Sequence, residues 1–140
     1  KEMGLNQTNF VNFSGEEDEG HYSTAFDLAR LARIFLKNEF LSGVIRTESL
    51  TVYDSLGDPY LLENTNKLLG NGFNGIKTGW TDQAGECFAG LFSRDNRRII
   101  TVVLKSQDRF RDTQILVEQI MNNFSWIDYS DRNSEDTAST

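Results

Sequence analysis

The spacing of apolar residues predicts two amphipathic helices in this chain. The first follows Thr24 and Asp27, a pair spaced like the start of a helix, and fades near Asn38. Its apolar positions are Leu28, Leu31, Ala32, Phe35 and Leu36. The second helix is predicted from about Arg109 to Asn123. Its apolar stripe consists of Phe110, Thr113, Val117, Ile120, Met121 and Phe124.

Three strand-like stretches lie between the two helices. Residues 73–80, which two glycines interrupt, form the first, and residues 86–93 and 98–104 form the others. The polar residues 94–97 separate the last two stretches and predict a hairpin turn. The order of a helix, three antiparallel strands and a helix predicts an α+β fold.

The other segments carry weaker signals. Residues 1–22 are rich in Asn, Gly and Glu and are predicted to form a loop with short turns. In the mixed segment 39–62, Val44-Ile45 and residues 50–53 could form short strands or irregular cover, and Pro59 breaks the pattern. Residues 127–140 are polar and acidic, and we predict a disordered tail there.

A partial sheet of about three strands packed with helices makes a thin core. It leaves a sheet edge and much apolar surface unpaired. We therefore expect either that polypeptide outside these 140 residues completes the sheet, or that the chain is only marginally stable.

Composition narrows the function classes. The hydrophobic content of 38% and the charged content of 25% are typical of a soluble globular protein. A net charge of -7 and the absence of a Lys/Arg cluster along the sequence argue against binding to nucleic acid or anionic lipid. We find no apolar run long enough to span a membrane and no signal peptide, although the mature start of an exported protein would look the same.

Metal and disulfide chemistry have few candidate residues. Cys87 is the single cysteine, which excludes an internal disulfide, and its apolar neighbours predict a buried, inert thiol. Because His21 is the single histidine, a tight structural zinc site is not expected, and we predict no metal and no cofactor.

The informative motif is Lys77-Thr78-Gly79 on the first predicted strand. Alternation along a strand puts Lys77 and Gly79 on one face. Lys77 offers a positive charge, Thr78 a hydroxyl, and Gly79 room for a ligand backbone to lie close. An extended peptide could pair along such an edge, with its terminal carboxylate on the charge and the hydroxyl. The alternative is a surface Lys and Thr beside a turn glycine.

Three segments resemble, in order, the low-molecular-mass penicillin-binding proteins that act as serine D-alanyl-D-alanine carboxypeptidases (peptidase family S11). They are residues 20–29 (GHYSTAFDLA), 64–69 (NTNKLL) and 75–85 (GIKTGWTDQAG). The resemblance covers residues 1–126 and implies a β-lactamase/transpeptidase-like fold. Trp80 departs from the family's usual Tyr, Phe or His.

No serine in the chain heads an S-x-x-K or S-x-N element. In the family both elements precede the matched region, so the resemblance implies that residues 1–126 are the C-terminal half of the catalytic domain. The N-terminal strands and the nucleophile helix would be absent. We therefore expect no catalytic residue in this chain and no activity from it alone.

The resemblance also implies roles for individual residues. Lys77, Thr78 and Gly79 would bind substrate, and the backbone N–H of Trp80 would help to stabilise an oxyanion. Arg109 resembles an arginine near the substrate carboxylate, with a solvated arginine at a helix start as the alternative.

Other polar residues are interpreted as structural. His21 precedes a helix cap and is not expected to act as a general base. Asp27 is interpreted as a helix cap, and Asn64 and Asn66 as residues that hold loop backbone.

The resemblance implies part of an exported cell-envelope enzyme that trims the terminal D-alanine from peptidoglycan stem peptides. Expected partners are a D-Ala-D-Ala peptide, β-lactams in the intact protein, and the missing half or a swapped copy of this chain, but not nucleic acid. Two alternatives stay open: a non-catalytic module that binds wall peptide or β-lactam, and a structural remnant in which Lys77 is idle.

Overall fold

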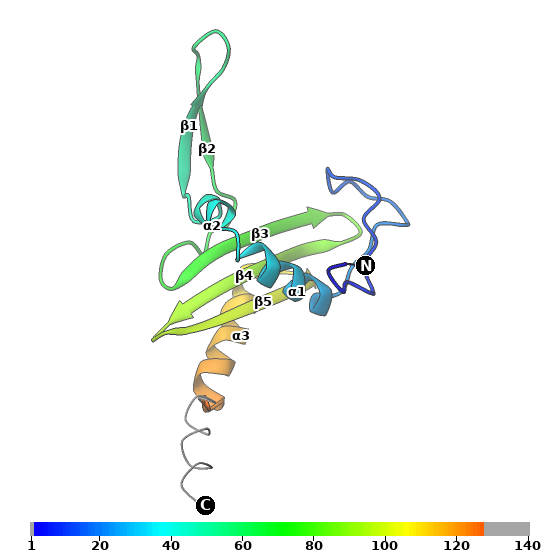
Figure 1. The fold of residues 1–140 in the computed structure, drawn as a ribbon, viewed down its shortest axis with the longest axis vertical. Coiled ribbons are helices and arrows are strands. Elements are labelled where there is room, and N and C mark those ends of the chain that lie inside the picture. The colour runs from blue at the N-terminus through cyan, green and yellow to red at the C-terminus, as the bar shows by residue number, and fades with distance from the viewer. Residues whose placement is uncertain (1, 128–140) are drawn as a thin grey trace, which may run out of the picture.

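The computed structural model describes residues 2–127, and most of the predicted tail, residues 127–140, lies outside the described residues. Eight elements follow one another along the chain (Figure 1). They are α1 (Ala25–Phe35), α2 (Glu39–Val44), β1 (Ser49–Tyr53), β2 (Pro59–Glu63), β3 (Phe73–Thr81), β4 (Gly85–Arg94), β5 (Arg97–Ser106) and α3 (Arg109–Asn123).

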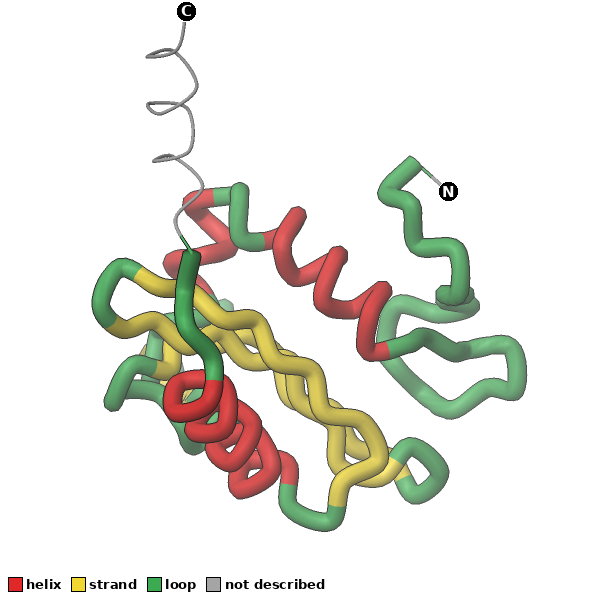
Figure 2. The backbone as a smooth tube through the Cα atoms, turned by 90° about the horizontal axis from the view of Figure 1, so that it is seen from below, coloured by secondary structure: helices red, strands yellow, loops and turns green. Residues whose placement is uncertain are grey.

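The centre of the molecule is an antiparallel three-stranded sheet in the order β3-β4-β5. Figure 2 shows α1 and α3 on opposite sides of these strands, and both helices contact β4 and β5. The predicted α+β architecture and its three strands are confirmed, and α3 has the predicted bounds.

The core lies between the sheet and α3. Phe73 and Phe92 from neighbouring strands meet edge to face with ring centroids 5.0 Å apart, and Ile99 and Val117 complete this buried cluster. Phe88, which is 1% exposed, meets Phe110 of α3 in a second edge contact. The alternation that was visible in the sequence therefore buries one face of the sheet under α3.

The start of α1 differs in one respect from the prediction. The hydroxyl of Thr24 accepts a hydrogen bond from the backbone N–H of Asp27 at 3.2 Å, as expected of an N-cap. The Asp27 carboxylate, however, is buried and accepts hydrogen bonds from Gln7 N and Thr8 Oγ1, both at 2.8 Å. The prediction that Asp27 caps the helix is wrong, because its side chain fastens the N-terminal segment to α1.

The segment between α1 and β3 holds two elements that the sequence did not reveal. Asn38 Oδ1 accepts from Leu41 N at 3.0 Å and starts the short α2. Val44 belongs to this helix and Ile45 caps its end, so neither predicted alternative, a short strand or irregular cover, holds at Val44-Ile45. Pro59 does not break a strand but begins β2, which pairs with β1 from Tyr53↔Pro59 to Ser49↔Glu63. A proline at the first residue of an edge strand removes no needed donor.

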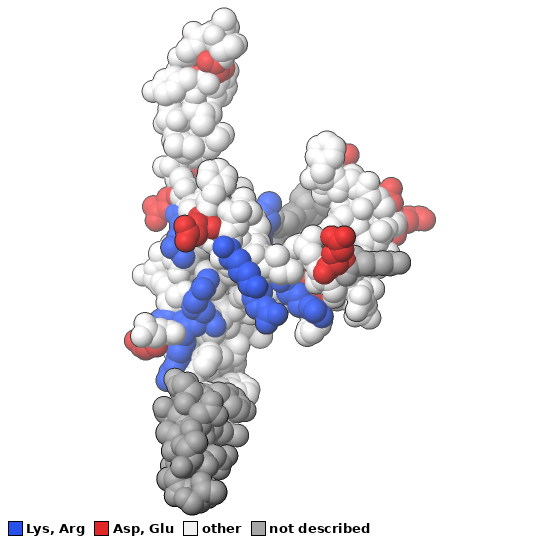
Figure 3. All heavy atoms as spheres, viewed as in Figure 1, with Lys and Arg blue, Asp and Glu red and all other residues white. Residues whose placement is uncertain are grey.

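The β1–β2 hairpin projects from the rest of the chain (Figure 1). Its apolar residues are largely exposed on both faces, at Leu50, Tyr53, Leu56, Tyr60, Leu61 and Leu62. Figure 3 shows acidic side chains near its tip. There the Asp54 carboxylate accepts from the backbone N–H groups of Asp58 and Leu56, which lower the pKa of Asp54. Part of the expected surplus of unpaired apolar surface thus lies on this hairpin, and other exposed apolar side chains lie elsewhere, among them Phe13, Phe40 and Phe124.

A β-bulge interrupts the pairing at the start of β3. Phe73 pairs with Phe92, but Ile76 pairs with Gly90, so one extra residue lies on β3 between them. Gly75 in the bulge has a φ of 110°, and a Cβ there would lie 2.9 Å from Ile45 Cβ. Both the backbone conformation and the close approach of the residue that ends α2 require glycine.

Basic side chains gather on the α1 side of the sheet. Arg33 of α1, Lys37 just after the end of α1 and Arg98 of β5 line a groove of about 350 Å³, together with Leu91 and Ile100. Figure 3 shows Lys and Arg side chains grouped over the central part of the molecule. Basic residues that are scattered along the sequence are therefore brought together on the folded surface.

Candidate functional site

The Lys77-Thr78-Gly79 motif lies on an outer strand of the central sheet. Within the described residues β3 pairs with β4 and with no other strand. Lys77 is opposite Ala89 and Gly79 is opposite Cys87, which confirms the prediction that Lys77 and Gly79 share a face. The opposite edge of β3 is open to pairing with an extended ligand.

Lys77 is exposed beside this edge. Its Nζ donates a hydrogen bond to the carbonyl oxygen of Thr78 at 2.5 Å. Lys77 and Thr78 also line a cavity of about 580 Å³ between α1, the end of α2 and β3. A positively charged side chain therefore forms part of the lining of this cavity.

This cavity has an apolar floor and a polar rim. Its apolar lining comes from Leu28, Leu31, Ala32, Phe35, Val44, Ile45, Ile76 and Ala89. Its polar lining comes from Glu63, Asn64, Thr65, Lys77 and Thr78. An anionic group could bind at the Lys77 and Thr78 side, while the floor accommodates apolar groups.

Thr78 is nearly buried, at 8% exposure, and its hydroxyl is already engaged. Thr78 Oγ1 and Thr65 Oγ1 are 2.7 Å apart, and either oxygen can be the donor. Thr65 is the middle residue of the N-T-N segment, thirteen positions earlier in the sequence. Thr65 was not among the predicted site residues, although its hydroxyl contacts the motif.

The two asparagines of the N-T-N segment hold the backbone of this loop. Asn64 Nδ2 donates to the carbonyl oxygen of Thr47 at 3.0 Å, and Asn64 Oδ1 accepts from Asn66 N at 2.9 Å. Asn66 Oδ1 accepts from Leu68 N at 3.0 Å. The prediction that Asn64 and Asn66 hold backbone is confirmed, and their bonds place Thr65 against β3.

Gly79 is not required by the packing of the chain itself. A Cβ at this position would lie 3.7 Å from Cys87 Cβ, which is an ordinary van der Waals distance, and no positive φ constrains the residue. The fold of the chain would tolerate a methyl group at this position. Any requirement for glycine would therefore come from a bound molecule or from another polypeptide segment.

Arg109 fastens the start of α3 to the end of the motif. Its Nη1 donates to the carbonyl oxygen of Gly79 at 2.7 Å, and its guanidinium lies 5.3 Å from the centre of the Phe110 ring. Glu86, on β4, accepts from the Arg109 backbone N–H at 3.0 Å and has a carboxylate oxygen 3.9 Å from Arg109 Nη2. Arg109 is therefore a held side chain rather than the solvated arginine of the alternative interpretation.

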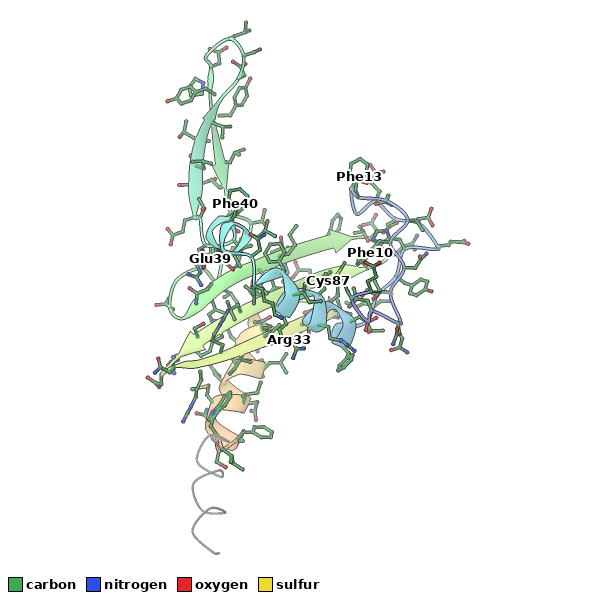
Figure 4. The ribbon with its side chains drawn as sticks, in the orientation of Figure 1. Phe10, Phe13, Arg33, Glu39, Phe40 and Cys87 are labelled. Carbon is green, nitrogen blue, oxygen red and sulfur yellow. The ribbon has the colours of Figure 1, made fainter. Side chains whose placement is uncertain are left out.

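Trp80 continues β3 beyond the motif, and its side chain is 63% exposed. It faces a second cleft of about 370 Å³ between the sheet and the N-terminal loop. Phe10 of that loop and Cys87 of β4 both line this cleft, and Figure 4 shows Phe10 extending toward the side of the sheet that bears Cys87. Cys87 is half-buried, so the prediction of a buried thiol is wrong.

The N-terminal loop contacts the turn that follows β3. Glu17 Oε1 accepts from the backbone N–H of Gln83 at 2.8 Å. The hydroxyl of Thr81 and then this N–H lower the pKa of Glu17 by stabilising its charged form. In the same loop, the ring of His21 packs 5.3 Å from Phe10, and its Nδ1 accepts from Val11 N at 3.4 Å, away from Lys77.

Two features are absent from the part of the chain that the structure describes, a cluster of metal-binding side chains and a helix that could span a membrane. Among residues 2–127, no three His, Cys, Asp or Glu side chains are grouped so that they could hold a metal ion. Within the same range, no helix combines the length and the apolar character needed to cross a bilayer.

Comparison with known proteins places these observations in a family. The family model described as D-alanyl-D-alanine carboxypeptidase, peptidase family S11, matches residues 1–108. The chain is 36% identical over 118 residues to the D-alanyl-D-alanine carboxypeptidase DacF of Bacillus subtilis. This match covers 82% of the present chain and 30% of DacF. The chain is 30% identical over 115 residues to DacC of Escherichia coli, covering 79% of this chain and 28% of that protein.

Solved structures agree with this assignment. The Streptomyces K15 DD-transpeptidase superimposes with a TM-score of 0.75 at 30% identity, over 86% of this chain and 48% of that one. A second solved structure is penicillin-binding protein D2 of Listeria monocytogenes in its cefotaxime-bound form. It superimposes with a TM-score of 0.70 at 36% identity, over 84% of this chain and 49% of that one. The chain thus spans about half the length of these structures and under a third of the curated relatives.

Proposed function

Because this chain belongs to the D-alanyl-D-alanine carboxypeptidase family of serine peptidases, family S11, we propose that it supplies the substrate-binding strand of such an enzyme. The enzyme would release the terminal D-alanine of a peptidoglycan stem peptide through a serine acyl-enzyme. The observation that carries the proposal is the position of Lys77-Thr78-Gly79 on an open outer strand, beside a cavity and tied to Arg109.

In this proposal the stem peptide pairs with the open edge of β3 as an added strand. Its terminal carboxylate binds near the Thr78 hydroxyl, with the charges of Lys77 and Arg109 attracting it. The backbone N–H of Trp80 serves as one donor to the oxyanion of the tetrahedral intermediate, a role worth about 3 kcal/mol of barrier lowering. Gly79 leaves room for the peptide backbone.

The nucleophile of this reaction would come from polypeptide beyond these 140 residues, because the sequence has no S-x-x-K element. Without an activated serine there is no covalent route. We therefore expect the chain alone to bind substrate but not to hydrolyse it. The apolar floor of the large cavity offers a surface on which the other half of a catalytic domain, or a swapped copy of this one, could pack.

A peptide titration tests the proposal. Diacetyl-L-lysyl-D-alanyl-D-alanine is added to the ¹⁵N-labelled chain, and the amide signals of residues 76–81 are followed. We expect saturable shifts at millimolar peptide, and weaker shifts with the L-alanyl-L-alanine isomer. An absence of saturable shifts with either peptide would count against substrate binding by this strand.

A second candidate function is a non-catalytic module that binds wall peptide or β-lactam, because a strand with an open edge can bind an extended peptide without a nucleophile. Fluorescent penicillin separates the two. A longer native protein that holds this chain and takes up the label covalently supports the enzyme. A native protein that binds the peptide without ever taking up label supports the binding module.

The proposed substrate lies outside the cytoplasmic membrane, and we place the function in the cell envelope for that reason. β-Lactams are proposed ligands of the intact protein, since they mimic the D-Ala-D-Ala end. Nucleic acid is not a proposed partner.

A further inference from the structure

The contact between Thr65 and Thr78 suggests a role for a residue outside the K-T-G motif. The two hydroxyl oxygens are 2.7 Å apart, and both side chains line the cavity of about 580 Å³ beside Lys77. We infer that Thr65 is a positioning residue that turns the Thr78 hydroxyl into a donor toward an anionic ligand. This inference rests on the proposed function of β3.

A hydroxyl group can form only a limited number of hydrogen bonds. Each threonine hydroxyl can donate one hydrogen bond and accept two. If Thr78 donates to Thr65, its single proton is used and the hydroxyl can only accept from a ligand. If Thr65 donates to Thr78, the Thr78 proton is free. A carboxylate only accepts hydrogen bonds, so its arrival selects the second arrangement.

The structure holds Thr65 in place for this role. The amides on either side of it, Asn64 and Asn66, are bonded to the loop backbone, so the loop has little freedom to withdraw Thr65 from β3. Thr78 is 8% exposed, and in such a partly desolvated place a chain of hydrogen bonds strengthens each member. A chain from Thr65 through Thr78 to the ligand would therefore favour a negatively charged end group over a neutral one.

The function of Thr65 is thus selectivity for charge rather than attachment of the loop alone. A carboxamide end can donate as well as accept, so it can bind to Thr78 in either arrangement. Loss of Thr65 should consequently weaken binding of a carboxylate more than binding of the matching carboxamide.

Two variants of the chain test this. Thr65→Val keeps the shape of the side chain but removes the hydroxyl, and Thr65→Ser keeps the hydroxyl. Each is titrated with diacetyl-L-lysyl-D-alanyl-D-alanine and with its C-terminal amide. We expect Thr65→Val to raise the Kd for the acid about five- to tenfold, as for one lost hydrogen bond, with less than a twofold change for the amide. Thr65→Ser should stay within twofold of the wild type for both.

Each other outcome has a distinct meaning. Equal weakening of acid and amide by Thr65→Val would show that Thr65 only supports the loop, and would overturn the inference. An unchanged Kd for the acid in a folded Thr65→Val variant would overturn it as well. No saturable binding by the wild type would overturn the proposed function itself, and the inference with it. Far-ultraviolet circular dichroism and thermal melting confirm that each variant is folded.

Discussion

Arg109 donates a hydrogen bond to the backbone carbonyl of Gly79 across thirty positions of sequence, at 2.7 Å. The bond joins the first residue of α3 to the last residue of the K-T-G motif. Glu86 of β4 accepts from the backbone N–H of Arg109 and lies 3.9 Å from its guanidinium, so Arg109 links β3, β4 and the start of α3. The strand that we propose for ligand binding is therefore held in place by a contact with α3.

Weakening this contact should loosen the end of β3. Arg109→Lys keeps the charge but cannot reproduce the forked donors, and hydrogen bonds from charged groups contribute about 1.5–3 kcal/mol. We expect the free energy of unfolding to fall by about 1–2 kcal/mol. Amide hydrogen exchange at residues 79–81 should become faster. The matched control is Arg111→Lys on the exposed surface of the same helix, and equal effects of the two changes would contradict this role of Arg109.

Two glycines of β3 should respond in opposite ways to a methyl group. Gly79→Ala meets no close neighbour, so the melting temperature should stay nearly unchanged while binding of the D-Ala-D-Ala peptide is lost or strongly weakened. Gly75→Ala combines a φ of 110° with a contact to Ile45 at 2.9 Å, and should cost about 1–3 kcal/mol of stability. Thermal melts and peptide titrations of both variants decide the matter. If the Gly79→Ala variant binds the peptide as the wild type does, the proposal that the ligand backbone lies close to Gly79 would be contradicted.

The contact of Glu17 with the turn after β3 should depend on pH. Its pKa is lowered because the Thr81 hydroxyl and the Gln83 N–H stabilise the carboxylate. A carboxyl group whose pKa is lowered by folding stabilises the native state fully above its ordinary pKa, and this contribution is lost as the pH falls through the lowered value. The Gln83 amide signal should therefore shift in acid below the ordinary range of glutamate. In Glu17→Gln this titration should vanish, and its persistence would assign it to another group.

The core contact between β4 and α3 should dominate stability. Phe88 is 1% exposed and packs edge to face against Phe110 at 5.5 Å. Phe88→Ala should lower the free energy of unfolding by about 3–5 kcal/mol, enough to unfold a thin domain. Phe40→Ala, at a residue that is 78% exposed, should change it by less than about 0.5 kcal/mol. Urea unfolding curves of the two variants measure the difference, and similar costs would contradict this placement of the core.

Periodic segments were the predictable part of this fold. The stripe of α3 and the alternation of β4 and β5 arise from burial on one face, and that pattern is written in the spacing of their apolar residues. The β1–β2 hairpin has apolar residues on both faces, so it has no such alternation, and Pro59 disguised the start of β2. The short α2 carried one usable signal, an asparagine at position 38 followed by Glu39, which is a good N-cap and first turn.

The sequence predicted the part of the candidate site whose residues are adjacent along the chain. It did not predict the contacts between residues that are far apart in sequence. Lys77, Thr78 and Gly79 are adjacent in sequence, so their shared strand and alternating faces followed from the period of a strand. Thr65 and Glu86 approach them only through a loop closure and a strand pairing, which no spacing rule reveals. Asp27 was misassigned for the same reason, because its partners Gln7 and Thr8 lie nearly twenty residues away.

The bulge before the motif shifts by one residue which side of the sheet the later residues of β3 face. With its one extra residue, Phe73 and Thr78 face the same side although they are an odd number of positions apart. Removing one residue of the bulge would leave four positions on each strand, so that Phe73↔Phe92 and Thr78↔Phe88 could both form in a regular ladder. The strand could therefore lose this residue without changing the sides on which Lys77 and Thr78 lie. What it would lose is the close approach of Gly75 to Ile45, which brings β3 against the end of α2.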